Sequence, residues 1–245
     1  MWTKIDYFFE KNKGFYLFLL LLLPVSQYGR TNKLEKDIMK TISFNKVWLT
    51  GNEKKYITQA LSEGKTCGNG NFTHKCQSFF EEKLGSCKCL LTTSCTDALE
   101  MCAMLAGIQP GDEVIVPSYT FVSTALAFVR QGARIVFADS RMDNPCIDEQ
   151  KLEALVTPRT RAIVPVHYAG IACDMDVILA VAERHNLLVI EDAAQAIDSF
   201  YKGRPLGSIG HLAAFSFHET KNIQCGEGGL LAINDPRFVK RSEIL

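Results

Sequence analysis

The sequence lacks an excess of charge of either sign. Its 245 residues include 27 lysines and arginines and 27 aspartates and glutamates, so the formal net charge at pH 7 is zero. A nucleic-acid-binding domain usually carries a basic patch or stripe, and none stands out here. With 47% apolar and 22% charged residues, the composition is that of an ordinary folded protein. A nucleic-acid partner is therefore not expected.

Paired cysteine motifs are also missing. The nine cysteines are an odd number without CxxC spacing, and no histidine cluster follows Cys87 and Cys89 at zinc-finger spacing. This pattern favours free thiols in a reducing compartment over a disulfide framework. It predicts no metal site and a cytoplasmic location.

No apolar run is long enough to cross a bilayer comfortably as a helix. The run at residues 15–25 follows Lys4, Lys11 and Lys13, as in a signal peptide, but no small-x-small cleavage site comes after it. A non-native or mis-started extension is favoured, while a membrane-proximal anchor and a true signal peptide stay open. Membrane contact is expected only through this run, if it is native.

The globular pattern begins near residue 42, so we expect an extension at 1–41 and a folded domain at 42–245. In that domain, helical spacing of apolar residues alternates with short apolar runs. The runs are continuous rather than alternating, which favours an α/β fold with a mostly parallel sheet covered by helices on both faces. The expected helices are 53–62, 73–84, 96–106, 121–131, 148–156 and 177–186. The expected strands are 88–92, 113–117, 134–138, 160–166, 187–190, 214–217 and 230–234.

Polar residues follow five of the expected strands, at 93–96, 118–121, 167–168, 191–192 and 216–221. Ligands of such sheets bind beyond the carboxyl ends of the strands. We therefore expect these five segments to meet at one rim and to form a binding site there.

Asp192 and Lys221 suit the two ends of a pyridoxal phosphate molecule. A carboxylate can pair with the protonated pyridine nitrogen, and a lysine amine can form a Schiff base. Each residue alone has an ordinary explanation, since Asp192 could cap a helix and Lys221 could be a surface residue. His218 and Glu219 beside the lysine could be structural or chemical.

Hydroxyls near a helix start suit a phosphate, although Ser94 or Thr96 could equally be an ordinary N-cap. Phe121 could stack on an aromatic ring, although a phenylalanine alone is usually a core residue. Gln195 is near enough to Asp192 to contact a ring hydroxyl. The order of phosphate-binding turn, stacking ring, acid, lysine and glycine turn makes coincidence an unlikely explanation.

These residues resemble those of the DegT/DnrJ/EryC1/StrS sugar-nucleotide aminotransferases, which are fold-type I pyridoxal phosphate enzymes. The resemblance covers residues 42–245 and is densest at 117–124, 164–170, 191–195 and 215–222. It implies the large domain of that fold, with pyridoxal 5'-phosphate as cofactor. It implies that Lys221 is catalytic, forming the internal aldimine and carrying a proton between the substrate carbon and the cofactor.

The resemblance also implies the cofactor-binding set. Asp192 would hold the pyridinium, Phe121 would stack on the ring and Gln195 would contact the ring oxygen. Cys95 (through its backbone), Thr96 and Ser216 would hold the phosphate.

Segments 67–73 and 217–221 are most similar to the transaminases that make dTDP-4-amino-4,6-dideoxygalactose. This similarity implies amino transfer from glutamate to C4 of dTDP-4-dehydro-6-deoxyglucose, in enterobacterial common antigen synthesis, by a homodimer. Family members continue beyond the position of Leu245 into a small C-terminal domain, which is missing here. A truncated, catalytically silent product that retains only cofactor binding or dimerisation therefore stays open as the alternative.

Overall fold

The computed structural model describes residues 45–47 and 49–245. The expected extension at 1–41, with its apolar run at 15–25, lies outside the described residues. Within the described part of the chain, no helix is both long and apolar enough to cross a membrane.

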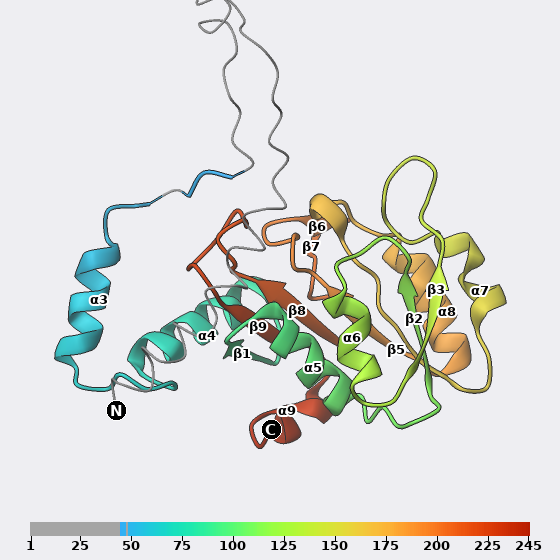
Figure 1. The fold of residues 1–245 in the computed structure, drawn as a ribbon, viewed down its shortest axis with the longest axis horizontal. Coiled ribbons are helices and arrows are strands. Elements are labelled where there is room, and N and C mark those ends of the chain that lie inside the picture. The colour runs from blue at the N-terminus through green and yellow to red at the C-terminus, as the bar shows by residue number, and fades with distance from the viewer. Residues whose placement is uncertain (1–44, 48) are drawn as a thin grey trace, which may run out of the picture. The chain divides into compact units, whose positions relative to one another are not determined.

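Seven strands form one sheet in the order β1-β9-β8-β5-β4-β2-β3 (Figure 1). Their bounds are Lys88–Thr92 (β1), Glu113–Pro117 (β2), Arg134–Ala138 (β3), Thr160–Ile163 (β4), Leu188–Asp192 (β5), Leu212–Ser216 (β8) and Gly229–Ile233 (β9). Neighbouring strands from β8 to β3 are parallel, whereas β9 is antiparallel to both β8 and β1. The predicted mostly parallel sheet is therefore confirmed.

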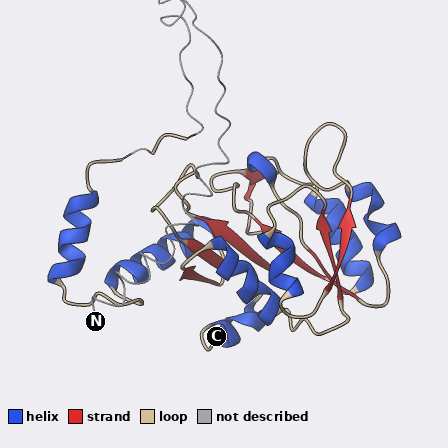
Figure 2. Cartoon of the chain, viewed as in Figure 1, coloured by secondary structure: helices blue, strands red, loops and turns tan. Residues whose placement is uncertain are grey.

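The helices are α3 (Glu53–Ser62), α4 (Asn71–Leu84), α5 (Cys95–Leu105), α6 (Ser123–Val129), α7 (Leu152–Leu155), α8 (Met175–His185) and α9 (Val239–Ser242). Figure 2 shows the helices in blue and the strands in red. Short 3-10 turns lie at Glu149–Lys151, Tyr168–Gly170 and Pro236–Phe238.

Several expected boundaries differ from those in the structure. The helix expected at 121–131 is only Ser123–Val129, and the one expected at 148–156 divides into a 3-10 turn and the short α7. The strand expected at 160–166 ends at Ile163, because Pro165 has no N–H to donate to the sheet. A two-stranded ribbon, β6 (Phe200–Tyr201) with β7 (Arg204–Pro205), was not expected, because two-residue strands carry no apolar pattern.

Apolar side chains cover both faces of the large sheet. On one face, α5 and α6 contribute Leu99 and Phe128 to a buried cluster. On the other face, α4 and α8 contribute Phe80 and Ile178 to a second cluster. The continuous apolar strands are explained by this arrangement, since each of their faces packs against helices.

The direction of the strands decides where the polar residues meet. Both β1 and β8 are antiparallel to β9, so they run the same way as each other and as β5, β4 and β2. The carboxyl ends of these five strands therefore lie at one edge of the sheet. This is the convergence that the sequence predicted, and the amino end of β9 lies at the same edge.

Candidate functional site

Asp192 is the last residue of β5, and only 4% of its surface is exposed. Its Oδ2 accepts a hydrogen bond from Thr124 Oγ1 at 2.7 Å, and its Oδ1 accepts one from the Ala194 N–H at 3.1 Å. Burial raises the pKa of Asp192, while these two bonds oppose the rise. The structure thus presents a buried carboxylate at the rim with both oxygens already oriented.

Lys221 lies in the loop that follows β8, and its side chain is half-buried. Its backbone N–H donates to the His218 carbonyl at 2.9 Å. Burial raises the pKa of both Asp192 and Cys95, and the positive charge of Lys221 acts against this rise at both residues. The sequence placed the lysine directly after a buried strand at 214–217. The strand ends at Ser216, which leaves Lys221 in a loop and less buried than expected.

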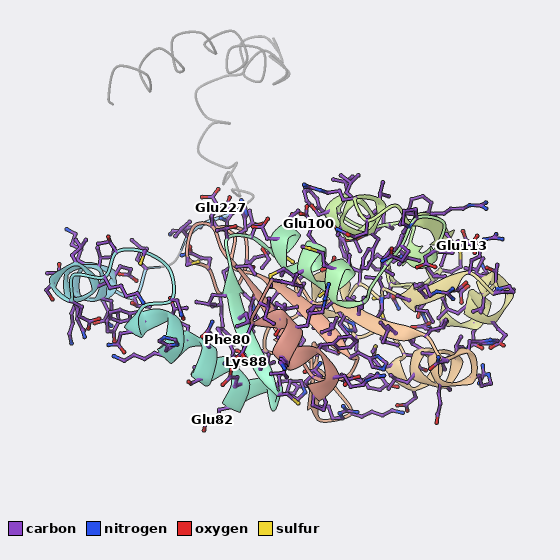
Figure 3. The ribbon with its side chains drawn as sticks, turned by 90° about the horizontal axis from the view of Figure 1, so that it is seen from below. Phe80, Glu82, Lys88, Glu100, Glu113 and Glu227 are labelled. Atoms are coloured by element: carbon purple, nitrogen blue, oxygen red, sulfur yellow. The ribbon has the colours of Figure 1, made fainter. Side chains whose placement is uncertain are left out.

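The lysine loop is held by contacts of its own residues. His218 Nδ1 lies 2.9 Å from Thr220 Oγ1, and His218 Nε2 lies 3.4 Å from Glu227 Oε1. Glu227, labelled in Figure 3, comes from the far side of the same loop. Below the loop, Phe217 stacks on Phe80 of α4 with ring centroids 5.3 Å apart. His218 is therefore a loop-fixing residue in this structure.

The amino end of α5 follows β1 and lies against the first residue of β9, Gly229. Ser94 is its N-cap and accepts from the Asp97 N–H at 3.1 Å, so the ordinary N-cap explanation holds for Ser94. Thr96 Oγ1 is instead 2.8 Å from Ser123 Oγ on α6. The backbone N–H groups of a first helical turn carry a partial positive charge, which suits an anion.

Gly229 allows β9 to come close to this helix end. A Cβ on Gly229 would lie 2.3 Å from the Ser94 carbonyl carbon and 2.5 Å from the Cys95 nitrogen. Gly229 also pairs with Ser216, the last residue of β8, which places that hydroxyl residue beside the same turn. Cys95, Thr96 and Ser216 are thus gathered around one potential anion site.

Phe121 and Gln195 border the site on the side of β2 and β4. Phe121 is 73% exposed, so it is not the core residue that its type alone would suggest. Gln195 Oε1 accepts from the Ala169 N–H at 2.7 Å, which ties it to the segment after β4. Beside them, Tyr119 and Tyr168 lie with ring centroids 5.1 Å apart.

Sequence reasoning missed Thr124, whose hydroxyl bonds to the Asp192 carboxylate. It listed His167 and Glu191 among the polar strand ends but did not predict that they form a buried pair, with Nε2 and Oε2 2.9 Å apart. Alternation along β5 could have indicated that Glu191 and Asp192 face opposite sides of the sheet. No sequence signal singles out Thr124, which reads as an ordinary helix residue.

The chemical groups at this rim match the parts of a pyridoxal phosphate molecule. A buried carboxylate suits a pyridinium nitrogen, an open aromatic face suits the ring, a half-buried amine suits the carbonyl carbon, and a helix end suits the phosphate. The structure brings all seven residues implied by the resemblance to one rim: Cys95, Thr96, Phe121, Asp192, Gln195, Ser216 and Lys221.

The chain is similar in sequence and in fold to known proteins. The chain is 45% identical over 189 residues to the spore coat polysaccharide biosynthesis protein SpsC of Bacillus subtilis, covering 77% of this chain and 48% of SpsC. It is 42% identical over 197 residues to the GDP-perosamine synthase of Caulobacter vibrioides, covering 80% of this chain and 53% of that enzyme. The chain thus spans about half the length of these curated relatives.

The fold agrees with that of Spr1654 from Streptococcus pneumoniae, solved in its PLP form, with a TM-score of 0.76 at 29% identity. The match covers 84% of this chain and 56% of Spr1654. The fold predicted from the resemblance is confirmed by this likeness. The sequence profile of the DegT/DnrJ/EryC1/StrS aminotransferase family matches residues 48–245. The chain therefore belongs to the DegT/DnrJ/EryC1/StrS aminotransferase family.

Proposed function

We propose that this protein is a pyridoxal phosphate-dependent aminotransferase that acts on a nucleotide-linked sugar. The observation that carries the proposal is the placement of Asp192 and Lys221 at neighbouring strand ends. Asp192 ends β5, Lys221 lies in the loop that follows the neighbouring strand β8, and the charge of Lys221 favours the ionised form of the buried Asp192 carboxyl. An acid and an amine on either side of one rim are what the cofactor needs.

In this proposal, Asp192 bonds to the ring nitrogen, Phe121 covers one face of the ring, and Gln195 contacts the ring oxygen. The phosphate is held at the amino end of α5 and the end of β8, by the Cys95 backbone, Thr96 and Ser216. When bound, pyridoxal phosphate supplies an electron sink for amino-group transfer. Lys221 Nζ would attach to the carbonyl carbon of the cofactor, with the carbonyl oxygen leaving as water. Once the amino group of a substrate has replaced it there, the freed amine would carry the proton at the reacting substrate carbon.

For the substrate, we propose dTDP-4-dehydro-6-deoxyglucose, with glutamate as amino donor and dTDP-4-amino-4,6-dideoxygalactose as product. The pathway proposed is cell-surface polysaccharide synthesis, specifically that of enterobacterial common antigen. Relatives named for spore coat polysaccharide and perosamine synthesis support the broader class of amino-sugar formation. The match of segments 67–73 and 217–221 supports the particular sugar. A homodimer is part of the proposal, supported by exposed apolar side chains along α6, such as Leu126 and Val129.

Cofactor binding is tested by adding pyridoxal phosphate to the purified chain. We expect an absorbance band at the edge of the visible range that borohydride reduction removes, leaving the cofactor attached. Lys221→Ala should abolish the attachment, because the amine of Lys221 is the one proposed to carry the cofactor. Lys240→Ala, on the short α9, is the matched control and should behave like the unchanged chain.

Absence of the band in the unchanged chain would overturn the proposal. A turnover assay with glutamate and the keto sugar then tests the substrate. Cofactor attachment without turnover would favour the alternative, a catalytically silent chain that retains cofactor binding.

A further inference from the structure

Thr124 places a hydroxyl directly behind the carboxylate of Asp192. Thr124 lies in the first turn of α6, and its surface is fully buried. Its Oγ1 donates to Asp192 Oδ2 at 2.7 Å across the gap between α6 and β5. A second hydroxyl, Thr120 Oγ1, lies 2.7 Å from Thr124 Oγ1. The two threonines and the aspartate thus form a short chain of hydrogen bonds.

The direction of the chain follows from the number of hydrogens. An ionised carboxylate can only accept, so the single hydroxyl hydrogen of Thr124 goes to Asp192. Thr124 Oγ1 can then only accept from Thr120, whose hydroxyl must be the donor. Both bonds therefore favour the ionised form of Asp192, and the chain begins at the half-buried Thr120 and ends at the buried acid.

Other groups facing Asp192 act on its ionisation too. His167, after β4, and Lys221, after β8, favour the charged form. Cys95 and Cys102 of α5 also face it, and burial raises the pKa of both thiols, so both are neutral at physiological pH. Burial of Asp192 itself is the largest influence and raises its pKa, and the Thr124 bond is the largest that opposes it. Losing this one bond would therefore shift the balance toward the protonated acid.

We propose that Thr124 is a positioning residue, which holds Asp192 ionised and aimed at the ring nitrogen of the cofactor, with Thr120 as the second member of the chain. This inference rests on the proposed function, because the ring nitrogen is that of pyridoxal phosphate. A branched side chain in a buried helical turn has few rotamers, which limits the positions that the Thr124 hydroxyl can take.

The test is Thr124→Val, which keeps the shape of the side chain and removes the hydroxyl. Pyridoxal phosphate affinity is measured by titration between pH 6 and pH 9 for this variant, for Thr124→Ser and for the unchanged chain. We expect Thr124→Val to bind about 10-fold more weakly at neutral pH, as for a lost hydrogen bond to a charged group. The ratio of its affinity to that of the unchanged chain should recover toward one as the pH rises, because alkaline pH ionises Asp192 without help. Thr124→Ser should stay near the unchanged chain throughout.

Thr157→Val is the matched control. Thr157 Oγ1 also donates to a buried carboxylate, Glu113 Oε2, at 2.6 Å, but Glu113 begins β2 and lies at the opposite edge of the sheet. Figure 3 shows Glu113 well away from the loop that carries Glu227. This variant loses a comparable bond and should keep its cofactor affinity.

A loss of affinity in Thr124→Val that is the same at every pH, or no loss at all, would overturn the inference. If Thr124→Val does not fold, Thr120→Val decides in the same titration, since it removes only the outer donor. Thr120→Val should show a smaller loss of affinity, with the same recovery at high pH. An affinity equal to that of the unchanged protein at every pH would contradict the chain of hydrogen bonds. Failure of the unchanged chain to bind would instead overturn the proposed function, and this inference with it.

Discussion

Glu191 and Asp192 are neighbours in β5, yet their carboxylates face opposite sides of the sheet and behave differently. Glu191 is fully buried and accepts from His167 Nε2 and from the backbone N–H groups of Gly207, Ile209 and Gly210. Burial acts to raise the pKa of Glu191, but these donors together hold it below 4.5. Asp192 has fewer donors, and burial raises its pKa. One residue of displacement along a strand thus separates an acid whose pKa is lowered by its donors from one whose pKa is raised by burial.

Glu191→Gln should destabilise the fold by about 3 kcal/mol, because an amide cannot accept at both atoms and leaves buried donors unpaired. The free energy of unfolding in urea measures this loss. Glu243→Gln is the control, since Glu243 forms only an exposed ion pair with Lys88 and should change stability by about 0.5 kcal/mol or less. Equal stability of the two variants would show that the Glu191 bonds contribute little.

The pH dependence of this contribution has a definite sign. Because the folded pKa of Glu191 lies below its ordinary value of 4.5, its stabilisation is fully present above pH 4.5. It is lost as the pH falls through the folded value. The difference in stability between the unchanged chain and Glu191→Gln should therefore shrink in acid.

At the scale of elements, the site depends on how closely β9 approaches the amino end of α5. Gly229 opens β9, pairing with Thr92 of β1 on one side and with Ser216 of β8 on the other. The space for a side chain there is filled by the Ser94 and Cys95 backbone. Backbone atoms cannot move aside as the tip of a flexible side chain can, so the strand and helix must separate if a side chain is added.

Gly229→Ala should therefore weaken pyridoxal phosphate binding and cost about 1–3 kcal/mol of stability, as overpacking does. Unfolding in urea and cofactor titration provide the two measurements. Gly68→Ala is a suitable control, because nothing lies within 4 Å of an added Cβ there. A fully stable Gly229→Ala with unchanged affinity would mean that the helix end is not the phosphate site.

At the scale of the whole molecule, all nine cysteines are free, as the sequence predicted. Cys67, Cys76, Cys87 and Cys225 are exposed, whereas the remaining five are buried or half-buried. Burial raises the pKa of the Cys89 thiol to about 12, which further protects it, because the thiolate is the reactive form. The fold therefore divides the thiols into two classes of reactivity.

A thiol-specific reagent should modify these four exposed cysteines quickly in the folded protein and all nine after unfolding in guanidinium. The number of thiols released, followed by absorbance, is the measurement. Pyridoxal phosphate should leave the fast class unchanged, because none of the four belongs to the proposed cofactor site. Nine fast thiols in the native protein would contradict the folded structure described here.

Several helices and strands can be located from the local sequence alone. The bounds of α3, β1, β2 and β3 follow from the spacing of apolar residues and agree with the structure. The direction of β9 does not follow from its residues, because a buried strand has the same continuous apolar sequence whether it is parallel or antiparallel to its neighbours. Likewise, β4 is shorter than its apolar run, because Pro165 cannot donate to the sheet.

The sequence by itself determined the α/β fold and the family. It also determined that the candidate site residues stand at strand ends, since each follows an apolar run that must be buried. The tertiary structure alone decided how these residues are supported. Thr124 comes from a helix and Asp192 from a strand far along the chain, and Glu191 meets its donors only when the loop after β7 folds beneath it. Hydrogen bonds between distant segments depend on where packing places them, and no local pattern records that position.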